Sequence, residues 1–189
     1  MRTTCWRLMS LLTLICLSSL SGPPARAAAL QTGIHGMVWG GHAADYPRLE
    51  KVREEGAVAY YIDRNTVYHA VGQPVSVVVY GFYRDKLFAA YIKLSSPNQT
   101  YYLEKHFNTE YGPAKVTAVG SGAETVYRWA NGDLKIKLKV KEAENDLKLG
   151  IYYAPLSTEL NQTQAEEGPS GTLGPPSSED KTTKSAPLF

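Results

Sequence analysis

Cysteine is nearly absent from this chain of 189 residues, and its two cysteines, Cys5 and Cys16, both fall within the first 29 positions. That stretch begins with basic residues, continues with a short apolar run over 8–20 and ends with alanines on both sides of Arg26. These features are typical of an export signal. The apolar run has 13 residues, whereas a membrane-spanning helix needs about 20. We therefore predict a signal peptide over 1–29 and an exported remainder without cysteine.

The lack of cysteine after the predicted signal excludes several kinds of chemistry. The exported part can form no disulfide, although its compartment would permit one. It also offers no thiolate to act as a nucleophile or to bind zinc or an iron–sulfur cluster. Cys16 raises the question of a lipid anchor, but the bulky, β-branched Ile15 before it disfavours the processing that such an anchor requires. We interpret both cysteines as apolar members of the signal.

A strong excess of one charge is also missing. Three of the 20 basic residues (Arg2, Arg7 and Arg26) and none of the 18 acidic residues lie in the predicted signal, so 17 basic and 18 acidic residues remain. Such a balanced chain has no global positive field that would attract nucleic acid or an anionic membrane. We predict no nucleic-acid partner and no transmembrane segment in the exported protein.

Large apolar residues become scarce near the end of the chain. Residues 157–189 are rich in Ser, Thr, Pro, Gly and Glu, and such a composition buries too little apolar surface to offset the entropy of ordering. We predict a disordered tail there. Between the signal and the tail, residues 33–155 are predicted to form a single domain, because their number suits one hydrophobic core.

The clearest pattern lies in residues 134–141, where four aliphatic residues alternate strictly with four lysines. This period of two predicts a strand with one apolar face and one lysine face. The Asn131-Gly132 pair just before it is a strong signal for a two-residue hairpin turn. Such a turn would place Trp129 opposite Leu134.

Two further hairpins are expected on either side of this region. The segment after the lysine strand alternates in the same way, and pairing Val140 with Leu147 keeps the apolar residues of both strands on one face. Earlier in the chain, two runs of β-forming residues flank a short polar turn. They predict a hairpin in which Tyr83 lies opposite Phe88.

One helix is predicted over residues 97–111, with Ser96 as its N-cap and Gly112-Pro113 after its end. Strands, a helix and further strands in this order are typical of an α+β protein with a mainly antiparallel sheet. We expect a sheet of about five to six strands packed on this one main helix. The expected strands are residues 58–62, 75–83, 87–94, 124–129, 134–141 and 147–153.

Motifs for catalysis or metal binding are missing as well. The four histidines, His35, His42, His69 and His106, lack the HExxH spacing, and the chain contains no GxSxG motif. Its glycine-containing loops lack the lysine of a nucleotide-binding loop. We therefore predict no catalytic residue, no cofactor and no metal site. A small hydrolase that uses surface carboxylates or His69 is the alternative.

The most suggestive features for a partner are lysines and tyrosines. Alternation places Lys135, Lys137, Lys139 and Lys141 in a row on one strand face, at a spacing of about 6.6–6.8 Å, and Tyr152 belongs to the next strand. Such a row could hold an anionic polymer, and tyrosines beside lysines make adaptable binding surfaces. The competing interpretation is an exposed face that lysines keep soluble and free of edge pairing. These five residues are the predicted binding residues.

Several short motifs occur in a fixed order along the domain. They are Ile34-His-Gly-Met-Val-Trp-Gly40, Val58-Ala-Tyr-Tyr61, Val79-Tyr-Gly-Phe-Tyr83 followed by Lys86-Leu87, Glu110-Tyr-Gly-Pro113, and Tyr127-Arg-Trp129. In this ordered set the chain resembles a group of small exported bacterial proteins of unknown function. The resemblance implies a place in the periplasm or outside a bacterial cell, and it supplies no activity or catalytic residue. We expect a non-enzymatic binding or accessory module whose partner is an envelope protein or an anionic glycan.

Overall fold

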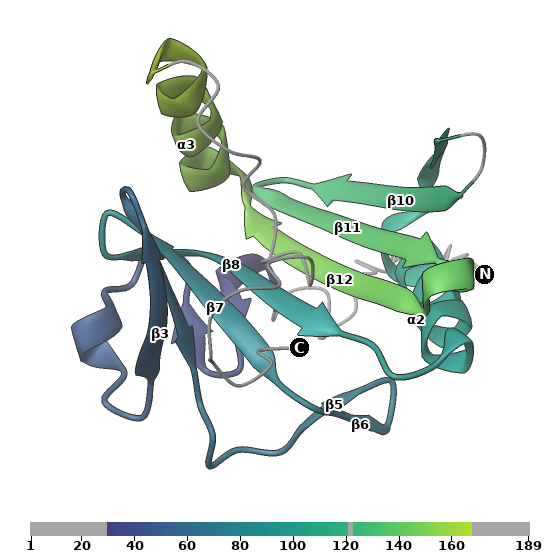
Figure 1. Cartoon of the computed structure of the whole chain (residues 1–189), viewed down its shortest axis with the longest axis horizontal. Coiled ribbons are helices and arrows are strands. Elements are labelled where there is room, and N and C mark those ends of the chain that lie inside the picture. Colours follow the sequence, from purple (N-terminus) through teal and green to yellow (C-terminus); the bar gives the residue numbers. More distant parts are fainter. Residues whose placement is uncertain (1–29, 121–122, 168–189) are drawn as a thin grey trace, which may run out of the picture.

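The structure, a computed structural model, describes residues 30–120 and 123–167. The predicted signal peptide and residues 168–189 of the predicted tail lie outside the described residues. The described chain forms an α+β fold around one eight-stranded sheet in which neighbouring strands are antiparallel (Figure 1). In spatial order, its strands are β3 (Glu50–Glu55), β4 (Val58–Ile62), β7 (Val78–Tyr83), β8 (Lys86–Lys93), β12 (Asp146–Tyr153), β11 (Leu134–Lys141), β10 (Glu124–Asn131) and β9 (Lys115–Val119).

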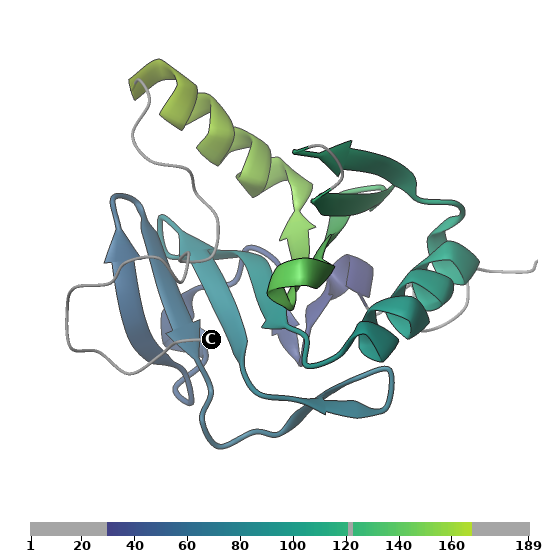
Figure 2. The same cartoon turned by 45° about the vertical axis from the view of Figure 1, so that its right-hand side comes forward.

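This sheet consists of two four-stranded halves that meet at its centre. Strands β3, β4, β7 and β8 form the first half, β9 to β12 form the second, and α2 (Pro97–Tyr111) connects them (Figure 2). The last strands of the two halves pair with each other, with Ile92 of β8 opposite Leu149 of β12. The predicted α+β class and mainly antiparallel sheet are confirmed, but the sheet has eight strands rather than five to six.

The two unexpected strands of the main sheet, β3 and β9, lie at its edges. The residues of β9 are all exposed, and those of β3 are exposed or half-buried, so neither strand shows the alternation that marks a half-buried strand. Charged side chains suit edges because they hinder pairing with another chain. The smaller elements are β1 (Gly33–Ile34), β2 (Met37–Val38), η1 (Ala43–Asp45), β5 (Tyr68–Ala70), β6 (Gln73–Val75) and η2 (Glu142–Glu144).

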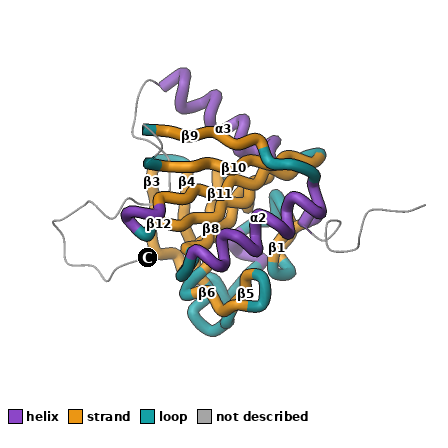
Figure 3. Tube along the Cα trace, turned by 90° about the vertical axis from the view of Figure 1, so that its right-hand side faces the viewer, coloured by secondary structure: helices purple, strands orange, loops and turns teal. Residues whose placement is uncertain are grey.

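Helix α2 spans the residues that the sequence predicts. The Oγ of Ser96 accepts a hydrogen bond from the backbone N–H of Gln99 over 3.4 Å, which satisfies one of the free donors at the helix start. Leu103 and Phe107 are buried, and the ring centroid of Phe107 lies 5.3 Å from that of Trp129 in β10. The helix therefore packs on one face of the second half of the sheet (Figure 3).

A second helix, α3 (Ala154–Glu167), follows β12 without a loop. The prediction that the tail begins at residue 157 is therefore wrong for 157–167, and the described residues form two helices of several turns rather than one. Leu160 is only 6 % exposed because it packs against the sheet, and Glu159 forms a 2.8 Å ion pair with Arg84 of the β7–β8 turn. These tertiary contacts, rather than composition, order this segment.

Two apolar clusters pack on opposite faces of the sheet. The larger cluster lies on the α2 face and includes Trp129 and the aliphatic residues of β11. The smaller cluster lies on the other face, in β4, β7 and β8, beneath α3. Its buried members are Val58, Tyr60, Ile62, Val79, Tyr83, Phe88, Ala89, Tyr91 and Leu160.

The registers of the second half preserve the predicted faces. Strands β11 and β12 pair as predicted, with Val140 opposite Leu147. The β10–β11 hairpin differs from the prediction by two residues, because Gly132-Asp133 forms its loop and Trp129 lies opposite Ile136. A shift of two residues leaves each side chain on its expected face, since side chains alternate with a period of two.

The β7–β8 hairpin differs from the prediction by an odd number of residues over most of its length. Tyr83 lies opposite Lys86 rather than Phe88, because Arg84 and Asp85 form the turn with φ values of 47° and 64°. This is a difference of two residues next to the turn, and a bulge beyond Phe82 reduces it to one residue from Gly81 to Val78. The predicted face assignment of β8 relative to β7 is therefore wrong.

Candidate functional site

The face of the sheet away from α2 carries the five residues that the sequence singles out. Leu138 of β11 is fully buried toward α2, so the lysines that alternate with it lie on the opposite face. Tyr152 of β12 lies directly opposite Lys135. We call the basic side chains of β8 to β12 on this side the basic face. They are Lys93, Lys115, Arg128, Lys135, Lys137, Lys139, Lys141 and Lys148.

Strand pairing brings lysines from three neighbouring strands together. Lys93 of β8 lies opposite Lys148 of β12, which in turn lies opposite Lys139 of β11. Like charges that face each other across strands destabilise a sheet. Sequence reasoning found only the third of these residues, because the other two become neighbours through the β8–β12 pairing between distant segments.

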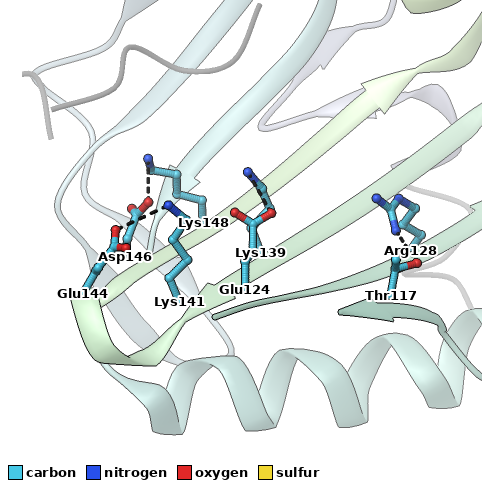
Figure 4. A network of polar contacts seen from close by, with 8 residues as sticks. All are labelled: Thr117, Glu124, Arg128, Lys139, Lys141, Glu144, Asp146 and Lys148. Carbon is cyan, nitrogen blue, oxygen red and sulfur yellow. Dashed lines mark hydrogen bonds and ion pairs between the residues drawn. The ribbon is translucent and has the colours of Figure 1, made fainter. Parts of the chain in front are cut away.

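One end of the basic face is neutralised by carboxylates. Lys148 pairs with Asp146 over 3.0 Å and Lys139 pairs with Glu124 over 3.1 Å, and Lys141 lies 3.4 Å from Glu144. All of these side chains project from the same side of the strands (Figure 4). Lys141, although predicted as a binding residue, therefore belongs to the neutralised end.

The other basic residues have no carboxylate partner among the described residues. Lys93, Lys115 and Lys137 form neither an ion pair nor a side-chain hydrogen bond there. Arg128 donates to the hydroxyl of Thr117 over 3.0 Å, and Lys135 donates to a hydroxyl of α3 over 3.3 Å. The basic face is thus neutralised at one end and keeps unpaired positive charge elsewhere.

Burial lowers the pKa of Lys137 below its usual value. The nearby cations of Lys139 and Arg128 lower this pKa further, whereas the carboxylate of Glu124 raises it. The environment of Lys137 thus disfavours the charge of its ammonium group. A bound anion would place a negative charge beside the ammonium of Lys137.

A groove of about 600 Å³ lies between α3 and the basic face. Four basic residues line it from β9, β10 and β11, namely Lys115, Arg128, Lys135 and Lys137. On the other side it is lined by α3, including Leu160. No carboxylate among the described residues lines this groove. Its positive lining therefore favours an anionic ligand.

Three tyrosines from three strands also line the groove. The ring centroids of Tyr60 and Tyr91 are 6.2 Å apart, and those of Tyr91 and Tyr152 are 5.7 Å apart. Burial raises the pKa of Tyr60 and of Tyr152 to about 12 and that of Tyr91 well above its usual value. The hydroxyls therefore stay protonated at neutral pH and can donate. None forms a hydrogen bond with another described residue.

A second groove, of about 960 Å³, lies on the α2 face between the two small hairpins and α2. It brings together His35, His69 and His106, but neither a carboxylate nor a serine among the described residues lines it. The ring of His35 stacks on Tyr68 at 4.3 Å and its Nδ1 lies 2.8 Å from the hydroxyl of Tyr80. His69 has no hydrogen-bond partner within the described ranges.

The described residues contain no group of His, Cys, Asp and Glu side chains that could hold a metal ion. The buried carboxylate Asp63 has a local role, because it accepts hydrogen bonds from the backbone N–H of Asn65 and from the hydroxyl of Thr66. Among the described residues, His69 pairs with no carboxylate. The exposed carboxylate of Asp85 lies 3.0 Å from the Nδ1 of His42, but neither residue lines either of the two grooves.

Comparisons with known proteins give no match: no protein-family model, no curated protein and no solved structure matches the chain. The resemblance to exported bacterial proteins therefore stays a prediction. None of the described helices has the length and apolar character needed to cross a membrane. The geometry and the charge of its residues therefore define the candidate site.

Proposed function

We propose that this protein is an exported, non-enzymatic binding module of the bacterial envelope, and that it holds an anionic glycan on its basic face. The observation that carries this proposal is the groove beneath α3, which is lined by four basic side chains and by no carboxylate of the described residues. Uncompensated charge of one sign in a concave site attracts a ligand of the opposite sign. Among the predicted binding residues, Lys135, Lys137 and Tyr152 belong to this groove.

The shape of the groove favours a glycan over a folded protein partner. Its volume of about 600 Å³ lies within the range of about 300–1,000 Å³ that is usual for sites of small ligands. A folded partner would instead need a broad surface of roughly 800 Å² on each side. The hydroxyls of Tyr60, Tyr91 and Tyr152, which have no hydrogen-bond partner among the described residues, add donors that suit the many oxygen atoms of a sugar.

The test compares two variants that lose the same number of charges. In the first, Lys135, Lys137 and Lys139 are all changed to Gln. In the control, the changed residues are Lys51 of the edge strand β3, Lys105 of α2 and Lys86, which lies on the same side of the sheet but at the far end of β8 and is not one of the eight residues of the basic face. Polygalacturonate, a polymer of carboxylated sugar rings, is titrated against each protein in calorimetry. We expect the first variant to bind at least about tenfold more weakly than the unchanged protein, since charge-assisted contacts are lost.

Two outcomes would contradict the proposal. Equal binding by the test and control variants would mean that the basic face is not the site. Tighter binding to poly-glutamate than to polygalacturonate would favour an acidic peptide over a glycan. Binding is also expected to weaken as salt rises, because the Debye length is about 10 Å at 0.1 M.

A further inference from the structure

The two edge strands of the main sheet differ in how well they are protected against pairing with another chain. Five of the six residues of β3 are charged, and its register shifts between Lys51 and Arg53. Charges and bulges are two usual protections of an exposed edge. Strand β9 has neither protection along its length, because it has one charged residue, Lys115, and pairs with β10 without a shift in register.

The edge at β9 is also open to solvent. Strand β9 is the outermost strand on its side of the sheet (Figure 3), and it pairs with no described strand other than β10. All five of its residues are exposed, including 55 % of Val116 and 47 % of Val119. An exposed edge with apolar side chains is a template for a further strand.

The pairing of β10 determines which backbone groups of β9 point outward. Asn131 directly precedes the two-residue loop of the β10–β11 hairpin, so it exchanges hydrogen bonds with β11. Bonded and non-bonded residues alternate along an antiparallel strand, and Val126 therefore bonds to β9, where Thr117 lies opposite. By the same alternation, the N–H and C=O groups of Val116 and Ala118 point away from β10.

A second copy of β9, antiparallel to the first and centred on Thr117, fits these outward groups. Val116 of each copy then lies opposite Ala118 of the other, and both pairs exchange their two backbone hydrogen bonds. The threonines face each other, which is a favourable cross-strand pair. Lys115 lies opposite Val119, so the two lysines stay about 13 Å apart along the strand, farther than the Debye length of about 10 Å at 0.1 M salt.

Shifting the centre away from Thr117 uses backbone groups that are already bonded. A shift by one residue toward α2 brings in Ala114, whose N–H donates to the Oδ1 of Asn108 over 3.0 Å. A shift by one residue in the other direction brings in Gly120, whose C=O accepts from the N–H of Ala123 over 3.1 Å. The strand is therefore complementary to itself in the register centred on Thr117.

This pairing places the basic faces of both copies on the same side. Residues that lie opposite each other in an antiparallel pair project from one face of the sheet, and Lys115 lies opposite Arg128 of the basic face. Thr117 and Val119 share that face, because side chains alternate along a strand. Lys115 also lines the groove beneath α3, so the two grooves lie on one continuous surface.

We propose that two copies of this protein pair through β9, with Thr117 opposite Thr117, and join their sheets into one. The proposal goes beyond the proposed function and does not depend on it, because it rests on an edge strand and not on a ligand. A five-residue strand buries less surface than the roughly 800 Å² per partner of a standard interface. We therefore expect a reversible dimer with a dissociation constant on the order of 10 μM.

The first experiment measures the molecular mass by sedimentation equilibrium at increasing protein concentration. The unchanged protein should pass from monomer to dimer. Val116→Pro should raise the dissociation constant at least about tenfold, because each copy loses an N–H donor of the interface. An edge strand accepts proline where its N–H faces solvent, so the monomer should fold. Val116→Thr, the matched control, keeps the N–H and should dimerise like the unchanged protein.

A second variant keeps the test decisive if Val116→Pro does not fold. Thr117→Lys retains every backbone hydrogen bond of the monomer and places like charges directly opposite each other in the dimer. It should raise the dissociation constant as well. A monomer at every concentration of the unchanged protein would overturn the proposal. A mass that grows beyond that of the dimer would also overturn it, because a contact between two different edges does not close.

Disulfide trapping tests the register. The two cysteines of the chain, Cys5 and Cys16, are first changed to Ser. Thr117→Cys then places two thiols opposite each other with their Cα atoms about 4.5 Å apart, within the roughly 4.4–6.8 Å that a disulfide spans. Ala118→Cys is the control, since its two Cα atoms are diagonal neighbours at about 7–8 Å. Oxidation should give a covalent dimer of Thr117→Cys alone, and equal yields would overturn this register.

Binding of polygalacturonate separates this proposal from the proposed function. The triple lysine variant should dimerise like the unchanged protein, because all three of its substitutions lie in β11. If the protein dimerises through β9 and does not bind the polymer, the glycan function is wrong and the dimer stands. If the protein stays monomeric and binds the polymer through its lysines, the dimer is wrong and the proposed function stands.

Discussion

The face of the sheet away from α2 changes character between its two halves. In β4, β7 and β8 it is apolar and buried, with Phe88 only 3 % exposed beneath α3. In β10, β11 and the start of β12 the same face carries lysines and arginine. Helix α3 contacts β8 and β12, the two strands at which the halves meet. The buried part of the face consists of apolar side chains, whereas the more exposed part carries charged ones.

The candidate site lies where these two regions meet. Tyr91 of β8 belongs to the buried cluster, yet it also lines the groove beneath α3. Tyr152 is half-buried beside it, in the strand next to the lysines. Tyrosine suits such a boundary because its ring packs in an apolar cluster while its hydroxyl reaches a polar site. A site with both apolar contacts and positive charge therefore arises from the transition between the regions.

The largest expected effect on the free energy of unfolding comes from a substitution in the buried half of this face. Phe88→Ala should lower the free energy of unfolding by about 3–5 kcal/mol, because it removes a buried ring and leaves a cavity. Lys139→Ala, on the uncovered half, should change it by about 1 kcal/mol or less, since its pair with Glu124 is partly exposed. Denaturation in urea measures both values. Equal losses would show that the two halves do not differ in burial as described.

A smaller effect of opposite sign is expected from the lysine row. Lys93 lies opposite Lys148 and has no acidic partner among the described residues, so Lys93→Gln should raise the free energy of unfolding by about 0.2–1 kcal/mol. Lys86→Gln, in the same strand, should leave it within about 0.5 kcal/mol of the unchanged protein. A loss of stability in Lys93→Gln would mean that this lysine holds the sheet together rather than straining it.

The sequence predicts the second half of the sheet better than the first, for a physical reason. Strict alternation over 134–141 identifies both faces of β11, and an error of two residues in the β10–β11 register leaves those faces intact. In β7 and β8 both faces are apolar, so alternation gives no signal to fix the register. The positive φ values of Arg84 and Asp85 are uncommon for such residues, and the bulge has no simple sequence signature.

The candidate site was predictable only in part for a related reason. Lysines within one strand are visible in the sequence, and four of them were found. Lys93 and Lys148 become neighbours only because β12 returns across α2 and three strands to pair with β8, a long-range contact that no local pattern encodes. Helix α3 was missed because few of its side chains are buried, as Leu160 is, and because its order depends on contacts with distant strands.

The smallest expected effect concerns the titration of a single lysine, and it distinguishes the two ends of the basic face. Burial lowers the pKa of Lys137, whereas the carboxylate of Glu144 raises the pKa of Lys141 through a hydrogen bond. The folded state therefore binds the proton of Lys137 less tightly than the unfolded state does. At neutral pH the protonated Lys137 therefore lowers the free energy of unfolding. This loss disappears as the pH rises from the pKa of Lys137 in the folded protein to that in the unfolded chain, near 10.4. Nuclear magnetic resonance of the two side chains should give the lower pKa for Lys137. Polygalacturonate should raise that pKa, because Lys137 lines the groove, and should leave the pKa of Lys141 in place. A shift of both by the same amount would mean that the polymer acts on the whole face and would remove the distinction between its neutralised end and its unpaired charge.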